Sequence, residues 1–400
     1  MHRGLRVVIV LAIMLAAGIA KADSLKIGVL SDFSGPYADV LGEGSVAAAK
    51  LAVEDMGGKV LDMPIEIVQA DTQNKPDIAS AIARKWYENE GVDVIIGGSS
   101  SAAGLAIQEV AREKQHVFLI TDSASSDFTG KACSPFGIHF SYDTYALSNG
   151  TALAMVKQGG KSWFFLTVDY AFGYALERDA AKFVKAAGGT VLGAVRHPLN
   201  ANDFSSYLLQ AQQSKANVVG LANASTDTVN AIKAASEFGI VEGGQKLAAL
   251  LMHITDVEAL GLKAAHGLVL TESFYWDLND QTRAWTKRFM ALHNKPPTMT
   301  QAGAYAAVLH YLKAVKATGG KDATSVVAKM KATPVSDMYN DNVQIRPDGR
   351  VLHAMYLMQV KSPAESKYPH DDYIVLAKTP GAEAYRPMSE GGCPMVAAKQ

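Results

Sequence analysis

Short β-branched segments alternate with long helical patterns along this chain, and the alternation limits the folds that it can adopt. In the first half, strands are predicted near 25–30, 63–71, 93–98, 116–121 and 137–141. The intervals carry apolar residues three and four positions apart, as in AGLAIQEVAREK, which is typical of helices with one buried face. Strands that alternate with such helices predict βαβ units and a mostly parallel sheet.

The same pattern begins again in the second half of the chain. Strands are predicted near 162–169, 188–198, 217–223, 246–252 and 267–276. A chain of 400 residues also exceeds the size at which one hydrophobic core stops growing, about 250–300 residues. We therefore expect an α/β fold with two doubly wound lobes.

The remaining segments are helical and then extended. Helical patterns cover 282–294 and 301–319, and a Pro-Asp-Gly turn predicts a β-hairpin within 343–361. Proline and glycine interrupt the chain after Tyr373, so we expect that part to lie on the surface.

The first residues, MHRGLRVVIVLAIMLAAGIAKADS, have the pattern of a secretory signal. Arg3 and Arg6 precede an apolar run, and Ala20-Lys21-Ala22 offers the small residues that a signal peptidase recognises. The run is shorter than the roughly 20 apolar residues that span a membrane. We expect residues 1–22 to be removed, and the mature protein to be periplasmic and not embedded in the membrane.

The chain contains two cysteines, Cys133 and Cys393. In an oxidising compartment the simplest expectation is a disulfide between them, and the alternative is two buried thiols. Neither has a second cysteine or histidine at ligand spacing, so no metal site is predicted. The net charge of -1 and the scattered lysines and arginines argue against a nucleic-acid partner.

The turn GGSSSAAG, 97–104, follows a predicted strand and precedes a predicted helix. A hydrolase elbow requires Gly-x-Ser-x-Gly, and no glycine stands at that spacing here. A phosphate-binding P-loop requires a lysine, and none is close. The stretch GEGSVA, 42–47, resembles a dinucleotide motif, but the strand before it ends near Ser31, too early for the tight turn required. We expect no catalytic residue and no cofactor.

A non-covalent binding role for these serines remains. Hydroxyl groups beside the free N–H groups of a helix's first turn suit a carboxylate. A second turn, Ser123-Ala124-Ser125, follows the next predicted strand, and ligands of open α/β sheets bind at that end of the strands. The two turns therefore predict a carboxylate site, and helix capping is the alternative role for each serine.

These motifs, in this order, resemble the periplasmic solute-binding proteins of ABC importers, of the leucine/isoleucine/valine-binding type. The resemblance rests on the signal, the two α/β halves, IGVLSDFSGPYADVLGEG, AVEDMGGK and GSSSAAG, and it covers about Leu25 to Lys361. It implies two lobes with three hinge crossings, closing over a ligand. Lobe 1 would be 25–143 plus 273–350, lobe 2 would be 144–272 plus 351–380, and 381–400 would be a tail.

The resemblance also implies roles for individual residues of the first lobe. There the two turns hold the carboxylate of the ligand. Ser101 and Ser125 would be the principal hydroxyl donors, with Ser100, Ser123 and Ala124 beside them.

The second lobe of the amino-acid binders holds the ammonium group of the ligand with an acidic residue. Here Met252 or His253 stands at that place, and Asn223 stands where an aromatic side chain is frequent. An unpaired ammonium group in a closed cleft would cost several kcal/mol. A ligand without an ammonium group is therefore favoured.

Aromatic residues at strand ends and hinge positions predict an apolar site for the rest of the ligand. The candidates are Phe33, Tyr37, Tyr170, Phe172 and the run Phe274-Tyr275-Trp276, and Phe33, Tyr170 and Tyr275 are preferred among them. Ordinary packing is the alternative, above all for Phe172 and for two residues of the run. Stacking on such rings contributes roughly 0.5–1.5 kcal/mol beyond area burial. We expect an aromatic or hydrophobic monocarboxylate, such as a benzoate, because the chain also resembles an aromatic-acid-binding branch of the family.

The partners implied are this small carboxylate and an inner-membrane ABC permease, for a protein that acts as a monomer. One alternative is a branched-chain amino-acid or amide binder, with Asp227, Asp169 or water replacing the acid. An exported hydrolase and an exported ligand sensor are further alternatives.

Overall fold

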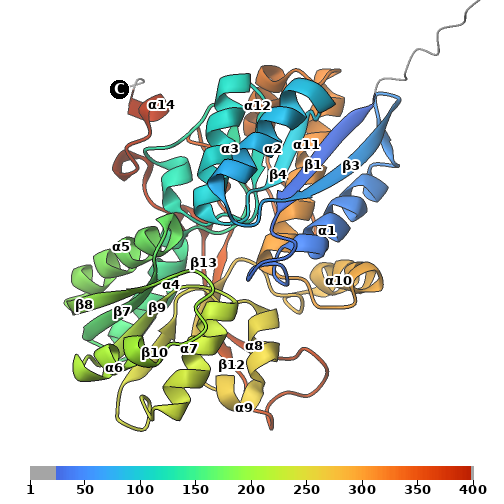
Figure 1. Ribbon diagram of the computed structural model, residues 1–400. Helices are drawn as coiled ribbons and strands as arrows, with labels where there is room; N and C mark the ends of the chain where they lie inside the picture. Colours follow the sequence, from blue (N-terminus) through green and yellow to red (C-terminus); the bar gives the residue numbers. More distant parts are fainter. Residues whose placement is uncertain (1–23, 398–400) are drawn as a thin grey trace, which may run out of the picture.

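The computed structural model describes residues 24–397, so the predicted signal peptide lies outside the described residues. Two separate parallel sheets form the centres of two lobes, which lie one above the other in Figure 1. This is the predicted class of fold. Every strand of the first sheet falls in the ranges expected for lobe 1, and every other strand falls in those expected for lobe 2.

The first sheet has the order β2-β3-β1-β4-β5-β6, in which only the short β2 is antiparallel to its neighbour. Its strands are β1 (Leu25–Ser31), β2 (Lys59–Val60), β3 (Met63–Asp71), β4 (Val94–Gly97), β5 (Val117–Ile120) and β6 (Gly137–His139). The helices of this lobe are α1 (Gly42–Asp55), α2 (Pro76–Lys85), α3 (Ser101–Lys114), α10 (Asp280–His293), α11 (Met299–Thr318) and α12 (Ala323–Ala332).

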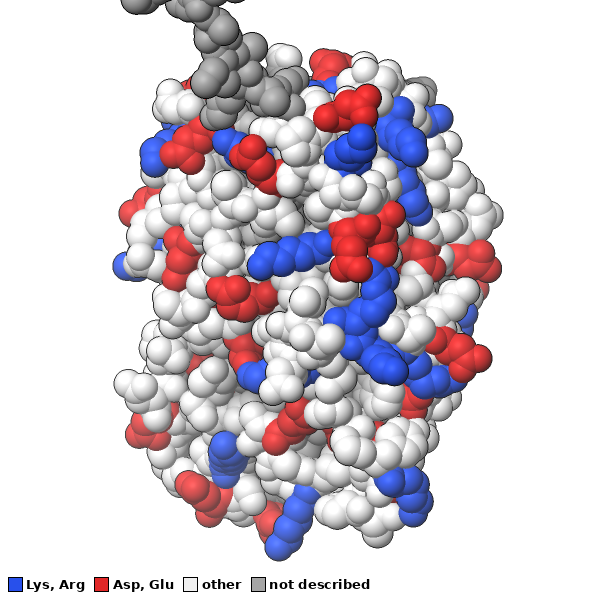
Figure 2. All heavy atoms as spheres, turned by 90° about the vertical axis from the view of Figure 1, so that its right-hand side faces the viewer, with Lys and Arg blue, Asp and Glu red and all other residues white. Residues whose placement is uncertain are grey.

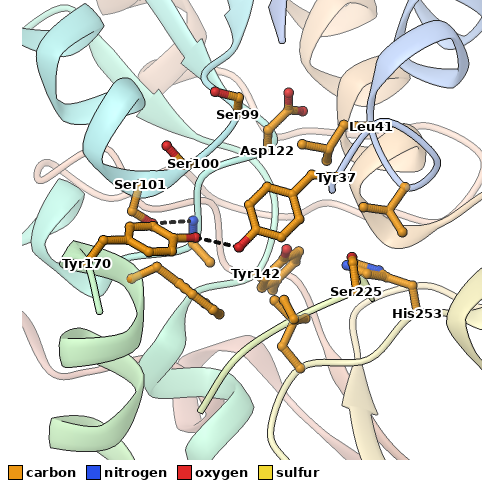
Figure 3. Close-up of a pocket in the computed structure, with 15 residues that line it drawn as sticks. Tyr37, Leu41, Ser99, Ser100, Ser101, Asp122, Tyr142, Tyr170, Ser225 and His253 are labelled. Carbon is orange, nitrogen blue, oxygen red and sulfur yellow. Dashed lines mark hydrogen bonds between the residues drawn. The ribbon is translucent and has the colours of Figure 1, made fainter. Parts of the chain in front are cut away.

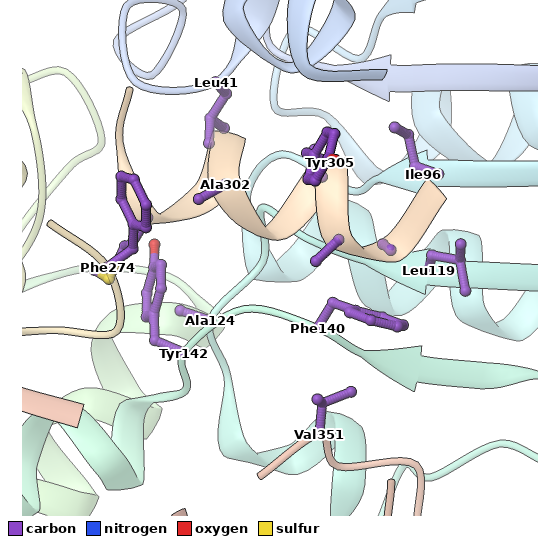
Figure 4. Close-up of a cluster of buried hydrophobic side chains, with 14 of the residues drawn as sticks. Leu41, Ile96, Leu119, Ala124, Phe140, Tyr142, Phe274, Ala302, Tyr305 and Val351 are labelled. Carbon is purple, nitrogen blue, oxygen red and sulfur yellow. The ribbon is translucent and has the colours of Figure 1, made fainter. Parts of the chain in front are cut away.

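The core of the first lobe surrounds α11, a helix that is buried along most of its length. Figure 4 shows Tyr305 of this helix among Ile96, Leu119 and Phe140, which belong to or follow strands of the sheet. Helix α1 packs against α11. The late part of the chain is therefore needed to complete the lobe that the early part begins.

The second sheet is parallel with the order β10-β9-β7-β8, and a third, antiparallel sheet has the order β11-β12-β13. The strands are β7 (Ser162–Val168), β8 (Thr190–His197), β9 (Val218–Ala222), β10 (Lys246–Ala249), β11 (Val269–Glu272), β12 (Met355–Val360) and β13 (Tyr373–Thr379). The helices are α4 (Thr144–Lys157), α5 (Ala171–Ala186), α6 (Ser205–Gln213), α7 (Thr226–Glu237), α8 (Ile254–Leu260) and α9 (Leu262–Ala265).

One prediction about the last part of the chain needs correction. The hairpin predicted within 343–361 is reduced to one bridge between Ile345 and Val351, because β12 pairs with β11 and β13 instead. The segment after Tyr373 is mostly exposed, as expected, but it contains the strand β13, which was not predicted, and the buried Tyr385.

The chain crosses between the lobes around residues 140–143, 273–279 and 351–354. Arg350 lies fully buried where the first and third crossings meet. Its guanidinium donates to the carbonyl oxygens of Val351 and Ser141, lies 3.6 Å from the Asp143 carboxylate and packs over the ring of Tyr385. Hydrogen bonds and packing thus hold these two crossings together.

The predicted disulfide between Cys133 and Cys393 is present. It attaches the C-terminal tail, with α14 (Pro394–Ala397), to the first lobe. The tail also accepts a hydrogen bond at the Glu383 carbonyl from Asn149 of α4, 2.9 Å away, in the second lobe. The tail therefore contacts both lobes (Figure 1).

The surface carries no large region of one charge on the side that bears α1, β3 and α10. Figure 2 shows acidic and basic side chains interspersed over that face. Within 24–397, no helix is long and apolar enough to cross a membrane, and no cluster of histidine, cysteine and acidic residues is arranged to hold a metal ion.

Candidate ligand-binding cleft

A cavity lies between the two lobes, and both lobes contribute to its walls (Figure 3). The space between the lining side chains is about 320 Å³, and this figure includes space that is open to solvent. The lining residues are Tyr37, Val40, Leu41, Ser99, Ser100, Ser101, Asp122, Ala124, Tyr142, Tyr170, Phe172, Ala224, Ser225, Leu251 and His253.

The serine turn of the first lobe forms one wall, and its serines have different roles. Ser100 precedes α3, and its Oγ accepts the N–H of Ala103 at 3.4 Å as a helix cap. Ser101 is the first residue of α3, and its Oγ accepts the N–H groups of Ala124 and Ser125, at 3.2 and 3.1 Å. Two accepted hydrogen bonds leave the hydroxyl proton of Ser101 available to a ligand.

The first turn of α3 adds backbone donors to this wall. The N–H groups of Ser101 and Ala102 belong to a turn that has no acceptor within the helix. With the positive end of the helix dipole behind them, they favour an anion at this place.

The second serine turn is arranged differently from the prediction. Ser125 Oγ accepts the N–H of Asp127 at 3.2 Å and so caps the short helix Ser126–Thr129. Ser123 Oγ donates to the carbonyl of Ser99 at 3.1 Å. Of this turn, only Ala124 lines the cavity, so Ser123 and Ser125 hold the two turns in place.

Glycine is required where these turns approach each other. A Cβ atom at Gly104, on α3, would lie 2.1 Å from Ser123 Oγ. Gly98 has a φ of 115°, which glycine adopts most readily. The glycines of GGSSSAAG therefore allow Ser101 to reach the second turn.

Asp122 also lines this wall, and the sequence reasoning missed it. Ser31 Oγ donates to Asp122 Oδ2 at 2.6 Å, and Thr121 Oγ1 donates to Oδ1 at 2.9 Å. Burial raises the pKa of Asp122 to about 6, against these hydrogen bonds, which lower it. Asp122 could have been identified from the sequence by its position just after β5, since it lies at the same strand end as Ser123.

Two tyrosines connect the lobes across the cleft. The hydroxyl groups of Tyr37 and Tyr170 lie 2.8 Å apart in one hydrogen bond. Burial raises the pKa of both phenols, so both stay protonated at neutral pH. The hydroxyl of Thr226 donates to the carbonyl of Pro36 at 3.2 Å and adds a second connection.

His253, and not Met252, faces the cavity from the second lobe. Met252 is fully buried in the apolar core of that lobe. Burial lowers the pKa of His253 to about 3, so its imidazole is neutral.

Three other predicted site residues do not line the cavity. Asn223 binds His197 Nε2 at 3.0 Å and accepts from Thr228 at 2.8 Å. Tyr275 donates to the carbonyl of His370 at 3.1 Å. Phe33 packs against the core of the first lobe.

The acids considered as replacements for the ammonium-binding residue also lie elsewhere. Asp227 accepts the N–H groups of Asn200 and Ala201, and Asp169 accepts the hydroxyl of Tyr174. Among the described residues that line the cavity, Asp122 is the only acid, and it belongs to the first lobe.

Two α/β lobes with a partly polar cavity between them define a ligand-binding protein of the two-lobe type. The chain matches the family model described as periplasmic binding protein over residues 24–367. It therefore belongs to the periplasmic binding protein family.

Related proteins agree in fold over most of the chain. A periplasmic binding protein from Burkholderia mallei is 52% identical, with a TM-score of 0.92 over 94% of this chain and 99% of that one. A branched chain amino acid ABC transporter periplasmic ligand-binding protein from Burkholderia xenovorans LB400 is 39% identical, with a TM-score of 0.82 over 93% and 100% of the two chains.

A more distant solved structure shares the fold and contains an aromatic ligand. It is an ABC transporter solute-binding protein from R. palustris in complex with benzoate, 24% identical, with a TM-score of 0.81 over 93% of this chain and 100% of that one. At this identity the likeness supports the fold alone.

Proposed function

We propose that this protein captures a small aromatic monocarboxylate between its lobes in the periplasm and delivers it to an inner-membrane ABC permease. The observation that carries the proposal is the arrangement of Ser101, whose oxygen is occupied by two N–H groups while its proton is not. This hydroxyl and the first turn of α3 together offer donors to a carboxylate.

The rest of the cavity suits an aromatic ring. Tyr37, Tyr142, Tyr170 and Phe172 line it together with Leu41. Aromatic pairs of this kind add to the free energy of burial. The R. palustris protein shows that this fold can hold benzoate.

A branched-chain amino acid is the second candidate, and the similarity to the branched chain amino acid ABC transporter protein of B. xenovorans favours it. Such a ligand would need a partner for its ammonium group. Asp122 could supply a charge only from the first wall, where Ser31 and Thr121 already donate to both of its oxygens. The neutral His253 offers no charge on the opposite wall.

Hydrolysis is less well supported by this arrangement. A nucleophilic serine needs a base that accepts its proton, whereas Ser101 Oγ is hydrogen-bonded to the backbone N–H groups of Ala124 and Ser125. A hydrolase would lose turnover of an ester or amide in Ser101→Ala, whereas a binding protein loses affinity alone.

The test is a ligand panel measured with the purified mature protein. Benzoate, hydroxybenzoates, 3-phenylpropanoate, leucine and isoleucine are compared by thermal shift, since a ligand of the folded state raises the melting temperature. Isothermal titration calorimetry then gives Kd for each ligand that shifts it. A shift with leucine and none with any aromatic acid would refute the proposed ligand class.

Export is tested separately. We propose cleavage after about Ala22, and the mass of the protein recovered from a periplasmic extract gives the N-terminus directly. A full-length mass in that extract would contradict the proposed cleavage.

A further inference from the structure

We infer that the wall of the cavity formed by His253, Ser225 and Tyr142 binds a hydroxyl group on the ligand. The ligand would then be a hydroxylated aromatic carboxylate, with its hydroxyl at the 3- or 4-position of the ring, away from the carboxylate. This inference rests on the proposed function and goes beyond it, because a bare aromatic acid would leave that wall without partners.

The imidazole of His253 is the first observation. The side chain is 1% exposed and lines the cavity. At the start of α8 the N–H of Asp256 faces the His253 side chain but is bonded to the carbonyl of His253 at 2.9 Å, and Nδ1 has no hydrogen-bond partner among residues 24–397. A neutral imidazole always presents one donor and one acceptor. A hydroxyl group on the ligand can pair with either of them.

Ser225 is the second and independent observation. Its Oγ is buried without a hydrogen-bond partner in the described part of the chain. Ser225 stands directly before α7, where a serine usually caps the helix, yet its side chain makes no capping bond. Its φ of 48° is uncommon for a residue other than glycine. A serine held in this conformation, with its hydroxyl unused by its own helix, indicates a role at the cavity.

Tyr142 completes this wall from the crossing segment between the lobes. Its ring packs edge to face with the imidazole of His253, at 5.8 Å between centroids. Burial raises the pKa of its phenol, so the group keeps its proton. A protonated phenol can donate a hydrogen bond to an oxygen of the ligand.

The position of this wall decides where the hydroxyl group of the ligand lies. Figure 3 shows Ser101 on one side of the Tyr37 ring, and Ser225 and His253 together on the other. A ligand ring that fills the cavity from a carboxylate at Ser101 would extend past Tyr37 toward His253. The substituent that meets His253 and Ser225 is the one remote from the carboxylate.

Selectivity follows from the cost of leaving these groups unpaired. A ligand that leaves a buried donor or acceptor of the protein without a partner binds more weakly, by roughly 10- to 100-fold in Kd. A site built to bind a hydroxyl group also discriminates strongly against the analogue that lacks it. We expect 4-hydroxybenzoate or 3-hydroxybenzoate to bind at least about tenfold more tightly than benzoate.

The experiment compares benzoate, 3-hydroxybenzoate and 4-hydroxybenzoate by calorimetry in four proteins. These are the wild type, His253→Leu, Ser225→Ala and the control Ser134→Ala. Ser134 is a buried serine that accepts a backbone N–H from Phe136 and does not line the cavity. In His253→Leu and Ser225→Ala, we expect the preferred hydroxybenzoate to lose about tenfold or more in affinity, while benzoate binds as well as before or better.

Binding of benzoate reports that each variant is folded. Should His253→Leu bind none of the three acids, His253→Gln restores a donor and an acceptor and is expected to restore the preference for the hydroxybenzoate. Ser134→Ala is expected to leave the ratio of the two affinities unchanged.

Two results would overturn the inference. One is a wild-type protein that binds benzoate as tightly as both hydroxybenzoates. The other is a loss of affinity in His253→Leu and Ser225→Ala that is the same for all three acids. Binding of leucine without any aromatic acid would instead refute the proposed ligand class, and this inference with it.

Discussion

Replacement of Ser101 by alanine tests the central contact of the cleft, because it changes stability and affinity by separate amounts. The hydroxyl oxygen accepts two backbone N–H groups, from Ala124 and Ser125, and both residues are buried. Alanine leaves both donors without this acceptor. Each unpaired donor costs roughly 1–2 kcal/mol, so the free energy of unfolding is expected to fall by about 2–4 kcal/mol.

This loss converts into a shift of the melting temperature. At about 2.1 cal/mol/K per residue, the entropy of unfolding for a chain of this length is roughly 0.8 kcal/mol/K, which gives a decrease of about 3–5 °C. Thermal unfolding without ligand measures it. Ser134→Ala, which removes one accepted hydrogen bond at 3.3 Å, is expected to shift the melting temperature by about half as much.

The effect on affinity comes from the lost hydroxyl proton. A hydrogen bond to a charged group contributes about 1.5–3 kcal/mol, which corresponds to roughly 10- to 150-fold in Kd. The N–H groups released by the substitution offer the carboxylate a partial replacement, so the lower end of that range is expected in Ser101→Ala. Calorimetry with the best aromatic acid measures Kd. A melting temperature that falls while Kd stays within twofold would refute the role of Ser101 as a ligand donor.

Three further predictions concern pH, the contact between the lobes and the disulfide. Burial raises the pKa of Asp122 to about 6, and a carboxylate ligand beside Asp122 is repelled once Asp122 ionises. The affinity for the ligand should therefore fall by up to about tenfold per pH unit above pH 6. Binding titrations from pH 5.5 to 8 measure this dependence, which should be absent in Asp122→Asn. Tyr37→Phe and Tyr170→Phe should each weaken binding by roughly two- to tenfold. If the increase in Kd of the double variant equals the product of the two single increases, the two hydroxyl groups act separately, which would contradict their coupling. Replacing Cys133 and Cys393 by serine should lower the free energy of unfolding, measured in denaturant, by about 3–5 kcal/mol. The Kd for the ligand should stay within about twofold. An unchanged denaturation midpoint would contradict the stabilising role of the disulfide.

Much of the fold could be predicted because the central strands of parallel sheets are buried on both faces. The predicted strands at 25–30 and 217–223 correspond to β1, Leu25–Ser31, and β9, Val218–Ala222. β9 is a continuous apolar run, and β1 is interrupted by Lys26. β13 was missed although its sequence, YIVLAKT, begins with an apolar run. The prolines and glycines that follow it favoured an irregular segment, and its side chains are mostly exposed at the edge of the sheet.

The site could be predicted only as far as strand ends locate it. Ser101 and Ala124 line the cavity because both follow neighbouring strands of one sheet. After β10 the sequence could not decide whether Met252 or His253 lines the cleft. Neighbouring residues point to opposite sides, and in the structure Met252 faces the core and His253 faces the cleft. Tyr142 reaches the cavity from a crossing segment, a long-range arrangement that no local pattern indicates.

The lobes also depend on each other in their packing. Arg350 and Asp143 are both fully enclosed, from residues far apart in the sequence. A buried arginine is stabilised only when its partners are present. The junction between the lobes therefore requires that both crossings are in place.

The disulfide has a consequence for the order of folding. Its cysteines are separated by 260 positions, and the second follows every strand of the two lobes. In a chain exported from its N-terminus, Cys393 enters the oxidising compartment after these strands. Cys133 must therefore remain a thiol until that point, when most of both lobes is already outside. The bridge closes on a nearly complete molecule, so it preserves a fold that the chain has to reach without it.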